Sequence, residues 1–102
     1  MHMCLTGDMM SAEDMERAGL VAKIYPADDL VDEAVKMGQK IASKGRMSVI
    51  MCKEAINVSQ EMSLEEGLRF ERRMFHALFA TADQKEGMNA FLEKRDPKFT
   101  HK

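Results

Sequence analysis

The segment from Met47 to Val58 is apolar around nearly its whole circumference when it is drawn as a helix. Its polar strip is narrow and consists mainly of Lys53, Glu54 and Asn57. A helix of this kind is buried on several sides at once, which is difficult to arrange in a helical unit of only 102 residues. The pattern therefore predicts packing against protein outside this chain, either a missing part of a longer chain or another subunit.

The segment after Pro26 carries a single apolar stripe at helical spacing from Leu30 to Ala42, with charged residues on the opposite face. Asp28 or Asp29 is expected to cap the start of this helix, and Gly45 is expected to end it. Ser48 or Gly45 is expected to serve the start of the next helix.

Two capping boxes, Ser63 with Glu66 and Thr81 with Gln84, open two further helices. The first helix is expected to run to about Phe79, and Pro97 is expected to stop the second. The side chains expected to form their apolar faces are Leu64, Leu68, Phe75, Leu78 and Phe79 in the first helix, and the inward-facing Met88, Phe91 and Leu92 in the second.

The N-terminal region combines a short helix with an apolar run. Ser11 and Asp14 resemble a capping box, and Gly19 is suited to end the helix in a left-handed conformation. The run Leu20–Tyr25 predicts a short edge strand, because Pro26 cannot donate to a sheet. This strand has no partner in the chain, and no loose end precedes the pattern, so we expect sequence to be missing on the N-terminal side.

Lysine and arginine total 15 and aspartate and glutamate total 17, which gives a formal net charge of −2. Nucleic acid is therefore not expected as the main partner, because phosphate binding requires a clustered positive excess. No apolar run approaches the ~20 residues that span a bilayer, and no targeting segment is visible. One local basic stretch is interpreted as a solvated helix end, and it comprises Lys94, Arg95, Lys98 and Lys102.

The cysteines and histidines do not form a metal-binding pattern. Cys4 and Cys52 are far apart and are expected to be free, buried thiols in a reducing compartment. His2, His76 and His101 share no helical spacing with one another or with the cysteines, so no metal site is predicted.

No active site is visible from residue types and spacing. There is no serine or cysteine nucleophile beside a base and no glycine-rich phosphate loop. The available glutamates are expected on polar helix faces beside lysine or arginine, and they are Glu54, Glu61, Glu65, Glu66, Glu71 and Glu86.

Two motifs at opposite ends of the chain resemble the crotonase superfamily. The first consists of Leu5-Thr6-Gly7-Asp8, Ser11-Ala12-Glu13-Asp14 and Ala18-Gly19-Leu20-Val21. The second is the run from Asp83 to Arg95 with Pro97 and Phe99, and Ile41-Ala42 and Lys53–Asn57 lie in register between them. The similarity covers essentially the whole chain, and the residues of the motifs are most similar to those of short-chain enoyl-CoA hydratases of the mitochondrial type.

This resemblance implies a mainly α fold with one short strand, the C-terminal helical part of a crotonase-like α/β protein. Residues 1–26 would end the core, and residues 27–102 would form the helical cover and trimerisation domain. The two catalytic glutamates and the oxyanion-hole amides would lie outside this chain, so no catalytic residue is assigned and the chain alone should be inactive. The complete protein would be a trimer or a dimer of trimers that acts on acyl-CoA in the mitochondrial matrix, without a metal or further cofactor.

The resemblance also implies three coenzyme A contacts. Phe75 and Phe91 would lie beside the adenine, and Lys94 would lie near a CoA phosphate. A flat aromatic ring and a flexible cation suit these two groups. The phenylalanines also fit as ordinary core residues, since they occur at helical spacing.

Two other interpretations remain open. Eleven methionines fit an adaptable core, but they also fit a docking surface of a non-catalytic helical interaction module. Within the same superfamily, an enoyl-CoA isomerase would differ mainly in the part that this chain lacks.

Overall fold

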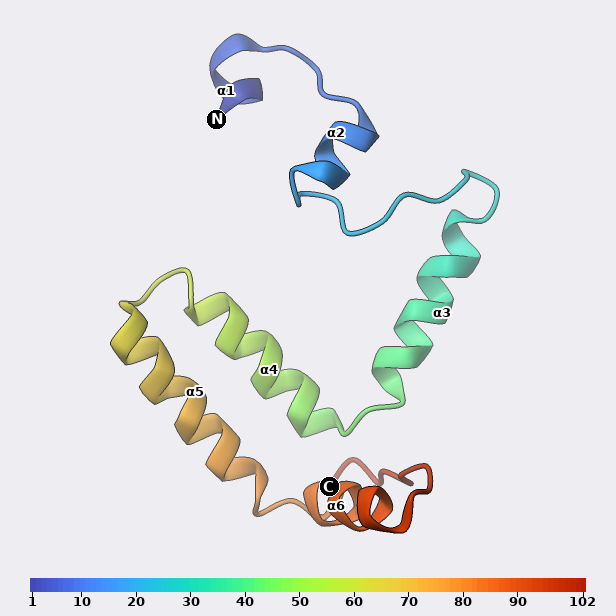
Figure 1. Ribbon diagram of the computed structural model, residues 1–102, viewed down its shortest axis with the longest axis vertical. Coiled ribbons are helices and arrows are strands. Elements are labelled where there is room, and N and C mark those ends of the chain that lie inside the picture. The colour runs from blue at the N-terminus through green and yellow to red at the C-terminus, as the bar shows by residue number, and fades with distance from the viewer. The chain divides into compact units, whose positions relative to one another are not determined.

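The computed structural model describes all 102 residues and contains six helices and no strand (Figure 1). The helices are α1 His2–Thr6, α2 Ala12–Arg17, α3 Leu30–Ala42, α4 Arg46–Val58, α5 Leu64–Leu78 and α6 Ala82–Glu93. The predicted mainly α fold is confirmed. The chain divides into two compact units, Met1–Lys36 and Met37–Lys102, with the boundary inside α3. The predicted division after residue 26 refers to roles in a larger protein and stays a prediction.

In the first unit, the predicted cap of α2 is confirmed, because the Ser11 side chain accepts a hydrogen bond from the Asp14 amide at 3.1 Å. The predicted strand Leu20–Tyr25 is wrong, since this segment is irregular. A strand needs a neighbouring strand for its backbone groups. Here the amides of Leu20 and Val21 instead donate back to the Met15 carbonyl of α2, at 2.9 and 3.2 Å.

The junction between α3 and α4 differs from the prediction in where α3 ends. Helix α3 ends at Ala42, and Gly45 is the N-cap of α4. Gly45 is buried, and a Cβ atom built on it would lie 3.2 Å from a carboxylate oxygen of Asp83. The absence of a side chain therefore allows the start of α4 to approach the start of α6.

Helices α4 and α5 form an antiparallel hairpin (Figure 1). The predicted cap of α5 is confirmed, because Ser63 accepts from the Glu66 amide at 3.3 Å. None of the six helices combines the length and the apolar character that a membrane crossing requires.

The thiols of Cys4 and Cys52 are free, as predicted, but the prediction that they are buried is wrong. Both are exposed, and no other residue of α1 or α4 is buried either.

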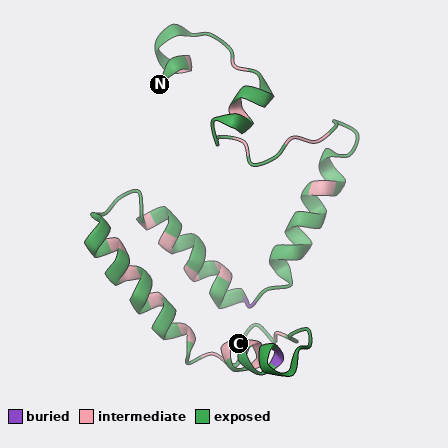
Figure 2. Cartoon of the chain, viewed as in Figure 1, coloured by how far each residue is buried: buried purple, intermediate pink, exposed green.

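In α6 the predicted Thr81 cap is confirmed, with a hydrogen bond from the Gln84 amide at 3.2 Å. The predicted inward face of α6 is wrong. Met88 is 53% exposed, Phe91 is 79% exposed and Leu92 is 73% exposed. The buried residues of α6 are Asp83 and Ala90 (Figure 2).

The C-terminal tail explains this orientation of α6, because it folds back along the helix and occupies the inner face. The ring of Phe99 lies 3.5 Å from the position that a Cβ atom would take on Gly87. The Asp83 carboxylate accepts hydrogen bonds from the amides of Thr100 and His101 at 2.7 and 2.9 Å.

Candidate functional site

The C-terminal end of α6 places Lys94 in an unusual backbone conformation. Its φ and ψ angles are 53° and 41°, the left-handed region that glycine normally occupies at a helix end. The Lys94 amide donates to the Phe91 carbonyl at 3.3 Å, and the Arg95 amide donates to the Ala90 carbonyl at 3.0 Å. These two bonds satisfy carbonyls that a helix terminus would otherwise leave free.

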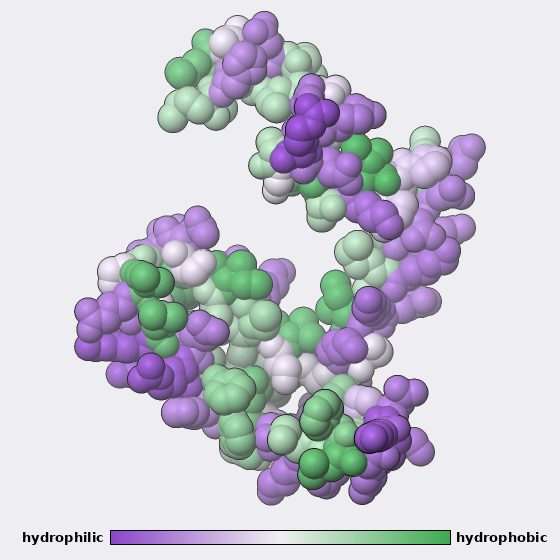
Figure 3. All heavy atoms as spheres, in the orientation of Figure 1, coloured by the Kyte–Doolittle hydropathy of each residue, from purple (hydrophilic) through white to green (hydrophobic).

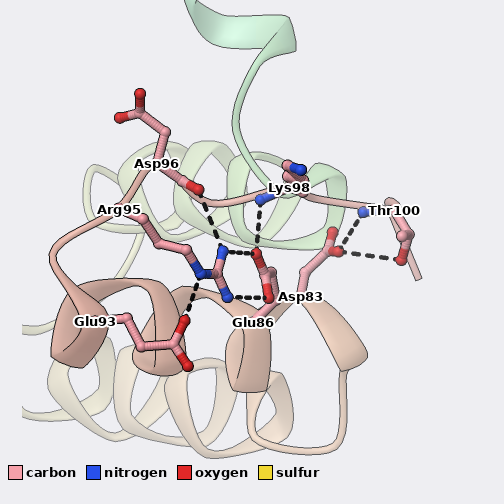
Figure 4. Close-up of polar contacts among 7 residues, drawn as sticks. All are labelled: Asp83, Glu86, Glu93, Arg95, Asp96, Lys98 and Thr100. Atoms are coloured by element: carbon pink, nitrogen blue, oxygen red, sulfur yellow. Dashed lines mark hydrogen bonds and ion pairs between the residues drawn. The ribbon is translucent and has the colours of Figure 1, made fainter.

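The next residue, Arg95, is held by carboxylates (Figure 4). Its guanidinium group donates to both oxygens of Glu86, at 2.6 and 3.0 Å, and its Nε atom donates to Glu93 at 2.5 Å. The Lys98 amide also donates to Glu86, at 2.8 Å. We call Glu86, Arg95 and the Lys98 amide the Glu86 clasp.

The clasp fixes the charge state of its carboxylate. The hydrogen bonds from Arg95, followed by that from the Lys98 amide, lower the pKa of Glu86 from 4.5 to about 2. A carboxyl group with this pKa is ionised near neutral pH and is a poor general acid. Glu65 and Glu66 are likewise paired, with Arg69 at 2.6 and 3.0 Å. These three pairs match the prediction that the glutamates lie on polar faces beside cations.

Lys94 is therefore a cation that this end of α6 leaves available, as is Lys98 of the following loop. Its side chain is exposed and makes no ion pair, whereas Arg95 is occupied by Glu86 and Glu93. Phe91, one turn earlier, is 79% exposed. The structure thus brings two of the three predicted coenzyme contacts, Phe91 and Lys94, together at one helix end.

The third predicted contact, Phe75, lies on α5 and is 58% exposed. Its ring packs edge-to-face on Phe79, with 5.3 Å between the ring centroids. Phe75 also lines an apolar groove of about 420 Å³ between α4 and α5, in which Glu71 is the only charged lining residue. Hydrophobic side chains reach the surface across α4, α5 and α6 (Figure 3).

Asp83 is the polar residue of this unit that sequence reasoning missed. It is 5% exposed and receives its hydrogen bonds from residues 17 and 18 positions later in the chain. No local pattern could indicate such partners, because they depend on how the tail folds back.

The whole chain, residues 1–102, matches the family model described as enoyl-CoA hydratase/isomerase. It is 55% identical over 102 residues to a probable mitochondrial enoyl-CoA hydratase of Dictyostelium discoideum, covering all of this chain and 37% of that protein. It is 52% identical over 102 residues to a probable enoyl-CoA hydratase of Rhizobium meliloti, covering all of this chain and 40% of that protein.

Solved structures of enoyl-CoA hydratases also superpose on the chain. The enoyl-CoA hydratase subunit I of Geobacillus kaustophilus HTA426 superposes with a TM-score of 0.91 at 40% identity, over 95% of this chain and 38% of that one. The enoyl-CoA hydratase of Mycobacterium smegmatis superposes with a TM-score of 0.88 at 32% identity, over 96% of this chain and 38% of that one. The chain belongs to the enoyl-CoA hydratase/isomerase family, and it spans 37–40% of the length of the two curated relatives described.

Proposed function

We propose that this chain is the C-terminal helical part of an enoyl-CoA hydratase, which adds water to a 2-trans-enoyl-CoA to give a 3-hydroxyacyl-CoA in fatty acid β-oxidation. In this proposal the catalytic glutamates and the oxyanion hole belong to a part of the protein outside the chain, and the chain alone is inactive. The family match over all 102 residues supports the proposal. So does the pairing of Glu65, Glu66 and Glu86 with arginines, which leaves them poorly suited to acid–base catalysis.

The chain's own contribution is a surface for coenzyme A. Lys94 would meet a CoA phosphate, and the rings of Phe91 and Phe75 would meet the adenine. A lysine ammonium group is a compact charge suited to phosphate, and an exposed aromatic ring offers a flat face to a base. The observation that carries this assignment is the conformation of Lys94 (φ 53°), since a glycine would fit the same helix end with less strain.

The exposed apolar faces of α4 and α5 favour assembly with further protein, here a homotrimer or a dimer of trimers. Helices α3, α4 and α5 contain no buried residue. The mitochondrial matrix is the proposed location, because relatives from Dictyostelium discoideum and Pongo abelii carry mitochondrial names. Bacterial relatives are similarly close, at 51–52% identity.

A hybrid enzyme tests the coenzyme surface. The matched segment of the Dictyostelium discoideum hydratase is replaced by this 102-residue chain, and crotonyl-CoA is compared with crotonyl-pantetheine, which lacks the nucleotide phosphates. Lys94→Gly should raise KM for crotonyl-CoA about fivefold, with kcat and both constants for crotonyl-pantetheine unchanged. An unchanged KM for crotonyl-CoA would contradict the assignment of Lys94.

A non-catalytic helical interaction module is the second candidate, favoured by the exposed methionines Met37, Met47, Met62 and Met88. Light scattering on the chain alone tests whether these faces dock onto protein. A dilution-stable monomer with sharp thermal unfolding would count against it.

A further inference from the structure

The loop that follows α6 is closed by a single carboxylate. Glu86 lies in the middle of α6 and binds residues nine and twelve positions later, the Arg95 guanidinium and the Lys98 amide. The Glu86 side chain is 25% exposed and that of Arg95 is 38% exposed, so water only partly screens the pair. A bidentate arginine–carboxylate pair fixes orientation as well as distance.

Lys94 lies inside the segment that this clasp closes. A residue other than glycine in the left-handed region is strained, and such strain persists only where surrounding contacts determine the conformation. The Glu86 clasp supplies these contacts from the residue directly after Lys94, while Glu93 holds Arg95 from the other side (Figure 4).

We propose that Glu86 and Arg95 are positioning residues for Lys94, which the clasp holds in its left-handed conformation so that its ammonium group is aimed before CoA arrives. This inference rests on the coenzyme surface proposed above. Fixing the backbone in advance removes part of the ordering cost of binding through a flexible lysine. The carboxylates Glu86 and Glu93 also occupy Arg95, so that the neighbouring Lys94, whose side chain makes no ion pair, stays available for a phosphate.

The first test follows the backbone of Lys94 by NMR in the full 102-residue chain. Glu86→Gln removes the charge of the clasp at nearly constant shape. Glu65→Gln is the matched control, because it removes another carboxylate that pairs with an arginine, Arg69 at 2.6 Å. We expect Glu86→Gln to shift the Lys94 carbon resonances away from left-handed values, with the control unchanged. If Lys94 keeps its left-handed conformation in Glu86→Gln, the proposal that the clasp holds this conformation is overturned.

The second test measures kinetics in the hybrid enzyme, with and without Lys94→Gly. Glu86→Gln should raise KM for crotonyl-CoA at least about threefold and leave crotonyl-pantetheine unaffected. The effect should vanish when Lys94 is already glycine, because Glu86 acts through Lys94. Glu65→Gln should change neither substrate.

The outcomes separate the two proposals. An equal loss of affinity from Glu86→Gln in both backgrounds, or a loss for both substrates, would overturn the positioning role and leave the coenzyme surface standing. If Lys94→Gly has no effect, the coenzyme surface fails, and with it the positioning of Lys94 for CoA, even where NMR supports the clasp as a structural element.

Discussion

Asp83 and the two glycines near it illustrate how single residues determine the packing of the second unit. Asp83 is the buried charged residue of the chain, and it joins the start of α6 to Thr100 and His101 of the tail. Gly45 allows this carboxylate to approach α4, whereas Gly87 faces the ring of Phe99 at ordinary contact distance. The two glycines therefore respond differently to an added methyl group.

Gly87→Ala should raise the free energy of unfolding by about 0.5–1 kcal/mol, because alanine favours a helix interior and its methyl group meets Phe99 at 3.5 Å. Gly45→Ala should lower it by about 1–2 kcal/mol, since its Cβ atom would crowd the Asp83 carboxylate at 3.2 Å. Urea unfolding followed by circular dichroism measures both. If Gly45→Ala stabilises the chain, the contact between Gly45 and the Asp83 carboxylate is not a tight one.

Lys94→Gly should raise the free energy of unfolding by about 1 kcal/mol, because glycine adopts the left-handed conformation without strain. The matched control is Lys85→Gly, which places glycine inside α6 and should cost about 0.7 kcal/mol. The same denaturation assay distinguishes them. Loss of stability in both variants would contradict the account of the helix end.

At the scale of elements, the helix starts were predictable and the strand was not. Ser63 and Thr81 cap helices by accepting hydrogen bonds from the amides of residues three positions later. Such a short spacing is a local pattern that the sequence shows directly. A strand depends on a partner whose presence no local pattern reveals, and Leu20–Tyr25 instead remains irregular beside α2. The orientation of α6 was mispredicted for a related reason, since the returning tail covers its inner face.

Ser63→Ala should lower the free energy of unfolding by about 1 kcal/mol, because the Glu66 amide loses its capping acceptor. Ser59→Ala provides the control in the same loop and should change stability by less than about 0.5 kcal/mol. The Ser59 hydroxyl caps no helix start, because it donates to the Ile56 carbonyl at 2.7 Å and accepts from the Gln60 side chain at 3.4 Å. Thermal unfolding checks the pair. Equal effects would argue against a specific cap.

The Glu86 clasp should weaken in acid. Because the pKa of Glu86 is lowered in the folded chain from 4.5 to about 2, the stabilisation is complete above pH 4.5 and is lost as the pH falls toward 2. A pH titration of the Lys98 amide resonance should report this transition, and Glu86→Gln should abolish it. A midpoint near 4.5 would show that the carboxylate is not held by Arg95.

At the scale of the whole molecule, the prominent feature is how much apolar surface the helices present. The all-round apolar segment Met47–Val58 predicted packing against other protein, and α4 does contain no buried residue of its own. What covers it stays a prediction, because the chain spans 37–40% of the two relatives compared. Family motifs distributed over the chain made the fold class predictable, whereas the catalytic groups of the proposed hydratase would lie outside it.

The most direct test of the central claim is the rate of crotonyl-CoA hydration by the unsubstituted hybrid enzyme, in which this chain replaces the matched segment of the Dictyostelium discoideum hydratase. We predict a kcat within about tenfold of the parent enzyme, while the 102-residue chain alone shows no turnover. A folded hybrid without hydratase activity, or measurable turnover by the chain alone, would contradict the account.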